Sequence, residues 1–243
     1  MNFAPYTAFF LFPAMVVLLE AGRMLRRRRA TEGSNSVEGA VFALFGLLLA
    51  FTFSGAISRY DQHRQLVTQE TNDIGTAYLR LSLLPADVQP KLRQLFREYT
   101  NSRLHIYDSV GDAVSPETVR LQNEIWQESI VAASSAGANP DATKLLLPAI
   151  NDMIDITSTR QNVFHLHPPA VVFLLLYAFS GIAAFMAGYG MKAGARDWVH
   201  TVVFAAVVTL TVYATQEIEY PRQGLIRLTE LDQGMVALRD SMR

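Results

Sequence analysis

The stretch GAVFALFGLLLAFTFSGAISRYDQHRQLVTQETNDIGTAYLRLSL, residues 39–83, begins fully apolar and becomes amphipathic without a break. Its first twenty residues, Gly39 to Ser58, carry no charge. That is about the length that crosses a ~30 Å hydrocarbon core at ~1.5 Å per residue. Charges follow from Arg59 onward, but no proline occurs before Pro85, so nothing forces a helix to stop at the membrane surface. We predict one long helix that crosses the membrane and continues as the first helix of a water-exposed domain.

Small residues recur along the apolar part of this stretch at every third or fourth position. They are Gly39, Ala43, Gly46, Ala50, Ser54 and Ser58. This spacing puts them on one face of a helix, and such a face lets another helix approach closely. Helix packing is the simpler interpretation, and lining of a pore is the sharper alternative.

The composition sets the class of protein. Of 243 residues, 50% are hydrophobic and only 18% are charged, which is rich in apolar residues and poor in charge for a soluble chain. The formal net charge of −1 predicts no nucleic-acid partner. The chain has no cysteine, which excludes disulfides, thiol nucleophiles and thiolate metal sites.

Three further apolar runs predict three more membrane spans. The first covers Pro5 to Leu19 and contains Pro13, where we expect a kink. Because no basic residue precedes it and Arg26 to Arg29 follow it, it is typical of an uncleaved anchor. The third, residues 170–190, follows Pro168 and Pro169 and has its own small-residue stripe at Ser180, Ala184 and Gly188, and the fourth runs from Trp198 to about Thr215.

The region between the second and third spans predicts a domain of about four helices. Apolar residues recur there at helical spacing, and strand patterns are absent. Ser115 with Pro116, and Asn139 with Pro140, are typical helix starts, and we expect Pro148 to bend the last helix. The predicted fold is therefore all-α, with a membrane hairpin at 1–59, a helical domain at 60–167, a second hairpin at 168–216 and a charged amphipathic tail at 217–243. We expect the second and third spans to be continuous with domain helices.

This topology places a set of polar residues at the domain-side ends of the spans. They are Arg59, Asp61, His165, Glu217 and Glu219. The basic residues Arg26 to Arg29, with Lys192 and Arg196, lie together at the opposite ends. By the positive-inside rule the basic side is cytoplasmic, so the domain and both termini are predicted to be extracytoplasmic.

Two segments carry a resemblance to a known family. LLLAFTFSGAISRYDQHRQLVTQETNDIGTAYLRL, residues 47–81, and EIEYPRQGLIRL, residues 217–228, resemble the bacterial bestrophin-like domain family, whose function is unassigned. The resemblance covers nearly the whole chain and implies a multi-pass protein of the bacterial inner membrane. AFTFSGAISRY is also similar, more distantly, to the second-span segment of bestrophin ion channels.

The bestrophin resemblance implies a homopentamer in the lipid bilayer, whose second spans surround a pore for small inorganic ions. Its bulky pore-lining positions fall at Ala43, Leu47 and Phe51, although Ala43 is too small to constrict a pore. The resemblance also implies a cytoplasmic domain, which conflicts with the charge rule; we follow the charge rule. Glu217 and Glu219 form a thinner acidic cluster than the calcium-binding segment of bestrophins, so no metal or cofactor is predicted.

Catalytic signatures are missing from the sequence. It has no GxSxG, no HExxH and no phosphate-binding glycine loop, so we predict that the protein is not an enzyme. His165 and His167 are two residues apart, and a helix would point them away from each other, which disfavours a shared metal. Two functions stay open: an oligomeric ion channel lined by the second span, and a non-conducting scaffold or sensor whose helical domain binds a partner.

Overall fold

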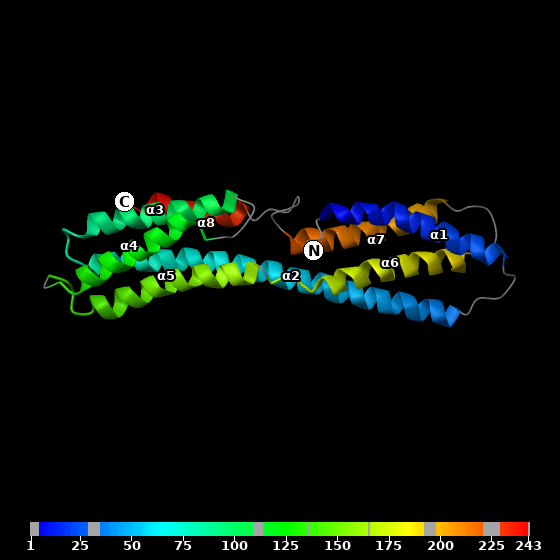
Figure 1. Ribbon diagram of the computed structural model, residues 1–243, viewed down its shortest axis with the longest axis horizontal. Helices are drawn as coiled ribbons and strands as arrows, with labels where there is room; N and C mark the ends of the chain where they lie inside the picture. The colour runs from blue at the N-terminus through cyan, green and yellow to red at the C-terminus, as the bar shows by residue number, and fades with distance from the viewer. Residues whose placement is uncertain are drawn as a thin grey trace. The chain divides into compact units, whose positions relative to one another are not determined.

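The computed structural model describes residues 5–28, 35–108, 114–135, 137–164, 166–191, 198–220 and 229–242. Within those ranges the chain is helical and contains no strand (Figure 1), as predicted. The elements are η1 (Pro5–Phe10), α1 (Leu11–Arg28), α2 (Asn35–Arg80), η2 (Leu81–Leu83), α3 (Gln89–Asp108), α4 (Pro116–Ala133), α5 (Ala142–Phe164), α6 (Ala170–Gly190), α7 (Trp198–Glu219) and α8 (Thr229–Ser241).

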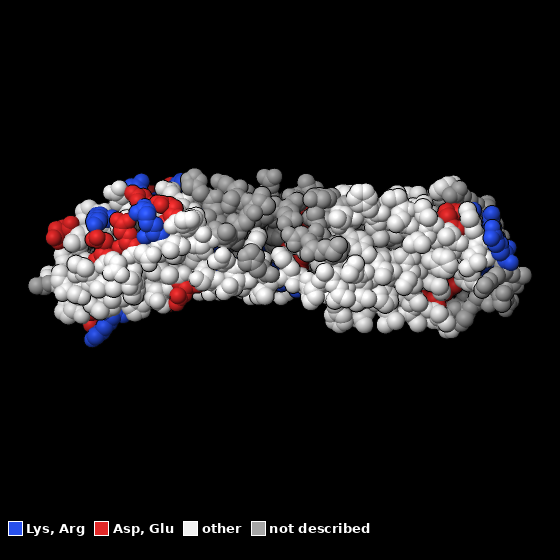
Figure 2. All heavy atoms as spheres, in the orientation of Figure 1, with Lys and Arg blue, Asp and Glu red and all other residues white. Residues whose placement is uncertain are grey.

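The helices form two compact units. The membrane unit comprises residues 1–60 and 167–226, and the domain unit comprises residues 61–166 and 227–243. Four helices are long and apolar enough to cross a membrane; they span Thr7–Arg28, Ser36–Leu83, Ala170–Gly190 and Trp198–Glu219. The visible face of the membrane unit is largely uncharged, whereas acidic and basic residues mix on the visible face of the domain unit (Figure 2). The four predicted spans are confirmed.

The predicted long helix is present as α2, which runs unbroken for 46 residues. At ~1.5 Å per residue it is about 70 Å long, more than twice the ~30 Å hydrocarbon core. The uncharged part, residues 39–58, is long enough to cross the membrane, and residues 61–80 of the helix belong to the domain unit. The helix tightens into η2 just before Pro85, where the sequence predicts its end.

The third span is not helically continuous with the domain, contrary to expectation. Helix α5 ends at Phe164, residues 166–169 are not helical, and α6 begins at Ala170. Pro168 and Pro169 explain the break, because proline lacks a backbone N–H and disfavours the helical conformation of the residue before it. Pro13, by contrast, lies in the first turn of α1 after η1, where its missing N–H has no helical partner to lose.

Within the membrane unit, α1 and α6 pack with their backbones in close contact. A Cβ atom on Gly22 would overlap the carbonyl oxygen of Phe185, and one on Gly188 would overlap that of Leu19. Only glycine leaves room for this approach, which is typical of helix pairs in membranes. Ser180 and Ala184 are also buried on α6, so the stripe predicted there is a packing face.

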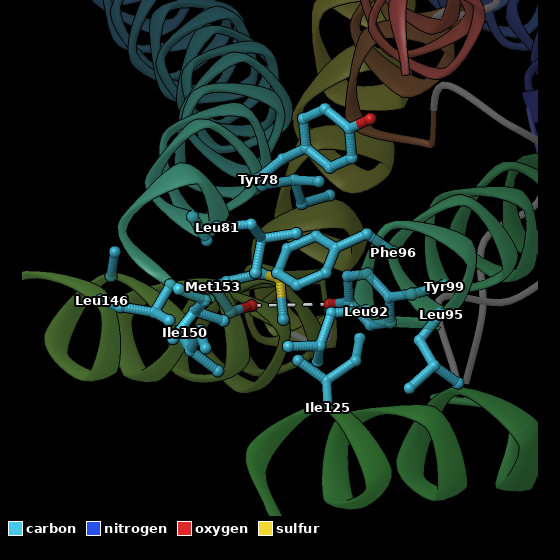
Figure 3. Close-up of a cluster of buried hydrophobic side chains, with 14 of the residues drawn as sticks. Tyr78, Leu81, Leu92, Leu95, Phe96, Tyr99, Ile125, Leu146, Ile150 and Met153 are labelled. Atoms are coloured by element: carbon cyan, nitrogen blue, oxygen red, sulfur yellow. Dashed lines mark hydrogen bonds between the residues drawn. The ribbon is translucent and has the colours of Figure 1, made fainter. Parts of the chain in front are cut away.

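The domain unit has a large apolar core. Its fully buried side chains come from α2, η2, α3, α4 and α5 and include Ile74, Leu81, Leu92, Phe96, Tyr99, Leu121, Ile125, Leu146, Ile150 and Met153 (Figure 3). Helix α8 closes this core: Met235 is buried, and Met242 packs against Thr100. The tail predicted as a charged segment thus contributes a packed helix to the domain.

Local start signals fix two of the domain helices. Ser115 caps α4, since its hydroxyl accepts a hydrogen bond from the Thr118 N–H at 3.1 Å and Pro116 opens the helix, as predicted. At the second signal the helix begins later than expected, at Ala142. The reason is that the Asn139 side chain accepts a hydrogen bond from the Asp141 N–H and forms a turn before the helix.

Candidate functional site

Helix α2 has a covered face within the membrane unit. Phe45, Thr52 and Ala56 are buried, and Phe42 meets Phe204 of α7 edge to face, with ring centroids 6.3 Å apart. The Thr52 hydroxyl donates to the carbonyl of Leu48 at 2.7 Å, which satisfies it inside the apolar layer. Through this face, α2 packs against other helices of the same membrane unit.

The opposite face of α2 is open. Phe51 is 69% exposed and Leu47 is 53% exposed, and Ala43 is exposed as well. Only 17% of the most apolar window of α2 is buried, compared with 28–33% for the other three spans. The three predicted pore-lining positions therefore all lie on a surface that the described part of the chain leaves uncovered.

The small-residue stripe of α2 lies on this same open face. Its six residues are exposed, and a Cβ atom on Gly39 or Gly46 would meet nothing within 4 Å. Gly188 on α6, in contrast, touches another backbone. Among the described residues, no helix of the same chain packs against this stripe, so helix packing there would need another copy.

A buried ion pair fixes the domain-side end of α2 within the membrane unit. Arg59 donates from Nε to both carboxylate oxygens of Glu219, at 2.9 and 2.8 Å, and its Nη2 lies 2.7 Å from Oε2. The Glu219 side chain, at the end of α7, is only 1% exposed. A buried carboxylate needs such a partner, because an unpaired charge is costly there. The pair joins α2 to α7 where both reach the end of the unit.

His167 joins this ion pair from the segment before α6. Its Nδ1 lies 3.3 Å from Oε1 of Glu219, and its ring stacks on Tyr220, with centroids 4.7 Å apart. The sequence marks His167 only by its place just ahead of Pro168. Its partner is 52 residues away, so no local pattern could identify the contact.

Two other predicted polar residues at the domain side, Glu217 and Asp61, have partners of their own. Glu217 is buried and accepts a hydrogen bond from Tyr213, one turn earlier on α7. Asp61 is exposed on α2 and pairs with Arg64 at 3.8 Å. His165 lies outside the described residues. Among the four of these five residues that the structure describes, Arg59 and Glu219 are brought into contact.

The acidic residues that follow the last span do not fit a calcium site. Calcium takes about six to eight oxygen ligands, but the Glu219 carboxylate is engaged by Arg59 and His167, and that of Glu217 by Tyr213. Across the described ranges, no group of three or more His, Asp or Glu side chains could hold a metal ion. The geometry favours a fixed internal cation, the guanidinium of Arg59, at this carboxylate.

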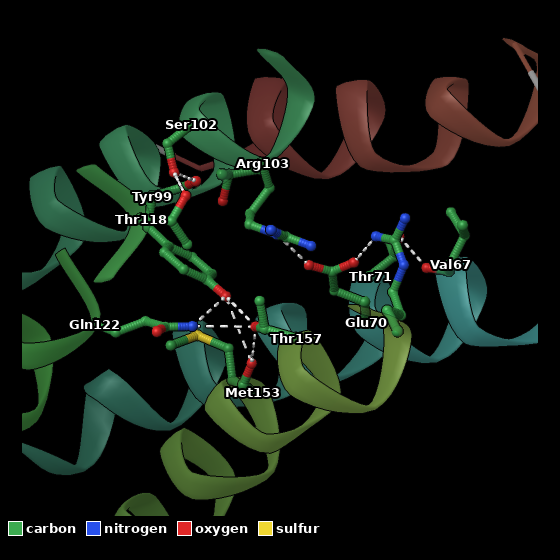
Figure 4. A network of polar contacts seen from close by, with 12 residues as sticks. Val67, Glu70, Thr71, Tyr99, Ser102, Arg103, Thr118, Gln122, Met153 and Thr157 are labelled. Carbon is green, nitrogen blue, oxygen red and sulfur yellow. Dashed lines mark hydrogen bonds and ion pairs between the residues drawn. The ribbon is translucent and has the colours of Figure 1, made fainter. Parts of the chain in front are cut away.

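A second buried ion cluster lies inside the domain unit (Figure 4). Glu70 of α2 is fully buried and accepts from Nε of Arg103, on α3, at 2.5 Å. Its other oxygen accepts from Arg160, on α5. The carboxylate thus ties three helices together, and loss of Glu70 would remove the anion that two buried arginines share.

A chain of neutral hydrogen bonds continues from this cluster. The Tyr99 hydroxyl lies 3.2 Å from the Thr157 hydroxyl, and the Gln122 amide donates to Thr157 at 3.0 Å (Figure 4). Burial, and then the nearby charge of Glu70, raises the pKa of Tyr99, so its hydroxyl stays a donor. The sequence pattern does not predict these hydrogen bonds. They stabilise the domain, because they satisfy polar groups inside its core.

Comparisons with known proteins agree with this architecture. A family model described as Bestrophin-like domain matches residues 8–231. Crystal structures of variants of a bacterial bestrophin homologue from Klebsiella pneumoniae share the fold. One has a TM-score of 0.78 at 11% identity and covers 100% of this chain and 97% of that one; another has 0.73 at 15% identity, with 97% of each chain covered. No curated protein matches the sequence.

Proposed function

Because the chain belongs to the bestrophin-like domain family, we propose that it is a membrane channel for small inorganic ions, lined by α2 and built from several copies of the chain. The open face of α2 carries this proposal. It is apolar, lies within the part of the helix that crosses the membrane, and is left uncovered by the other described helices.

In a symmetric oligomer, the open faces of several α2 helices would surround a pore. Leu47 and Phe51 are one helical turn apart, so copies of α2 around an axis would present two stacked apolar rings. Apolar rings can gate a pore by excluding water when it is narrow. Ala43, one turn further, would leave a wider opening. The small residues Gly46 and Ala50, which lie between these positions, would let α2 helices of neighbouring copies approach closely. The family resemblance favours five copies.

The Arg59–Glu219 ion pair supports the same arrangement. It holds the domain-side end of α2 against α7 of its own chain, so the lining helix would keep its orientation about its own axis.

We place the protein in the bacterial inner membrane. The domain and both termini are proposed to be extracytoplasmic, because three arginines, Arg26 to Arg28, crowd the far end of α1.

Ion flux from liposomes tests the proposal. Purified protein is reconstituted, and efflux of K⁺ and of Cl⁻ is compared among the wild type, Phe51→Ala, Leu47→Ala and the control Val207→Ala. Val207 is an exposed apolar residue of α7, proposed to face lipid. Truncating a pore ring should speed flux, whereas the control should match the wild type. No flux from a folded oligomer under either ion gradient would refute the channel and favour a scaffold.

A further inference from the structure

The open face of α2 does not end where the apolar part ends. Asp61, Gln65 and Asn72 follow Ser54 by seven, eleven and eighteen residues on one unbroken helix. At 3.6 residues per turn, all three project within about 20° of Ser54. All are exposed, as are Ser54 and Ser58. One uncovered strip therefore runs along α2 from its apolar part into a polar continuation.

Asp61 is the charged residue centred on this strip. Its side chain is 54% exposed. Arg59 is neutralised by Glu219, and Glu70 is buried against two arginines on the other side of the helix. Arg64 is rotated by about 80° from Ser54, at the edge of the strip.

The surroundings of Asp61 keep its charge effective. The residues beside it line a shallow groove and are all polar: Arg64, Gln65, Thr68, Gln69 and Asn72. Its contact with Arg64, at 3.8 Å, joins two side chains that are each more than half exposed. Such exposed pairs are weak and are screened by water and salt. The carboxylate is thus available to passing ions.

We infer that Asp61 sets the charge preference of the pore. One carboxylate from each copy would form a ring at the domain-side entrance of the pore, and this ring would favour cations over anions. This inference rests on the proposed channel function. Arg64, at the edge of the same strip, opposes the preference, because its positive charge lowers the local cation concentration.

Reversal potentials test this inference. Currents through the reconstituted full-length protein are recorded across a KCl gradient, which gives the K⁺ to Cl⁻ permeability ratio. The wild type should favour K⁺. Asp61→Asn should lower the ratio on the order of fivefold, as expected for several screened charges near one ion. Arg64→Gln should raise it.

A matched control is available in the domain unit. Asp141 and Lys144 form another exposed pair three residues apart, also at 3.8 Å, but they lie at the start of α5 and are not part of the strip along α2. Asp141→Asn makes the same chemical change and should leave the permeability ratio unaltered. Equal shifts in Asp61→Asn and Asp141→Asn would overturn the inference in favour of a general surface-charge effect.

The possible failures are distinguishable. Current with an unaltered permeability ratio in Asp61→Asn and in Arg64→Gln overturns the role of Asp61 and leaves the channel standing. A wild type that prefers Cl⁻ overturns it too. Absence of current from the folded wild-type oligomer refutes the channel itself, and the inference falls with it.

Discussion

In the membrane unit, the two faces of α2 carry similar apolar side chains, but one face is buried within the chain and the other is exposed. Phe45 and Phe51 are six residues apart on one helix, yet Phe45 is 6% exposed and Phe51 is 69% exposed. In water, so much uncovered apolar surface would mark an interaction site or an aggregation risk. In a membrane it can face lipid, another copy or a pore, so hydrophobicity alone does not identify its role. What distinguishes the two faces is whether the other helices of the chain pack on them.

The contrast extends into the domain unit, where α2 buries Glu70 and exposes Asp61. Glu70→Ala should therefore cost the most, about 3–5 kcal/mol of unfolding free energy, because it removes the carboxylate that two buried arginines share. Asp61→Ala should cost no more than about 0.5 kcal/mol. Denaturant unfolding in detergent, followed by Trp126 fluorescence in a Trp198→Phe background, measures both. Equal costs would contradict the assignment of the two sides.

The two phenylalanines should differ next. Phe45→Ala is expected to lower the free energy of unfolding by about 3 kcal/mol, since it opens a cavity between α2 and the other helices of the membrane unit. Phe51→Ala should leave the stability of detergent-solubilised monomer within about 0.5 kcal/mol of the wild type. Thermal unfolding of the two variants side by side checks this. A large loss in Phe51→Ala would mean that its face is covered within the chain.

A pair of glycines gives the smallest and most specific comparison. Gly188→Ala puts a methyl group into the backbone of Leu19 and should cost about 1–3 kcal/mol through overpacking. Gly46→Ala meets open space within the chain and should leave the detergent-solubilised monomer unchanged or stabilise it by up to about 1 kcal/mol, because alanine favours the helix. The melting temperatures of the two variants should shift in opposite directions or, for Gly46→Ala, not at all.

Hydropathy and local signals predict much of this fold. Uncharged runs locate the four spans, the absence of proline before Pro85 predicts the length of α2, and Ser115 with Pro116 predicts the start of α4. These signals act within a few residues. The stripe of α2 could be placed on one face from its spacing, but not on the open face, because exposure depends on where α1, α6 and α7 pack.

The contacts that the sequence did not reveal all join distant segments. Glu70 meets Arg103 and Arg160 across 33 and 90 residues. A signal existed in retrospect: Glu70 falls at helical spacing between Val67 and Ile74, both buried, and a charge on an apolar face requires a partner. Gly22 gave no such signal, since its contact is made by the backbone of α6, which no side-chain pattern reports.

Accessibility of single cysteines in the pore helix tests the central claim most directly. The chain has no cysteine of its own, so Phe51→Cys introduces a unique thiol on the open face. A water-soluble, charged thiol reagent should react with it and block ion flux. The controls Phe45→Cys, on the covered face, and Val207→Cys, on the exposed side of α7, should keep conducting. Flux through Phe51→Cys that survives the reagent, while a membrane-permeant reagent labels the thiol, would show that this face of α2 meets lipid and would contradict the proposed pore.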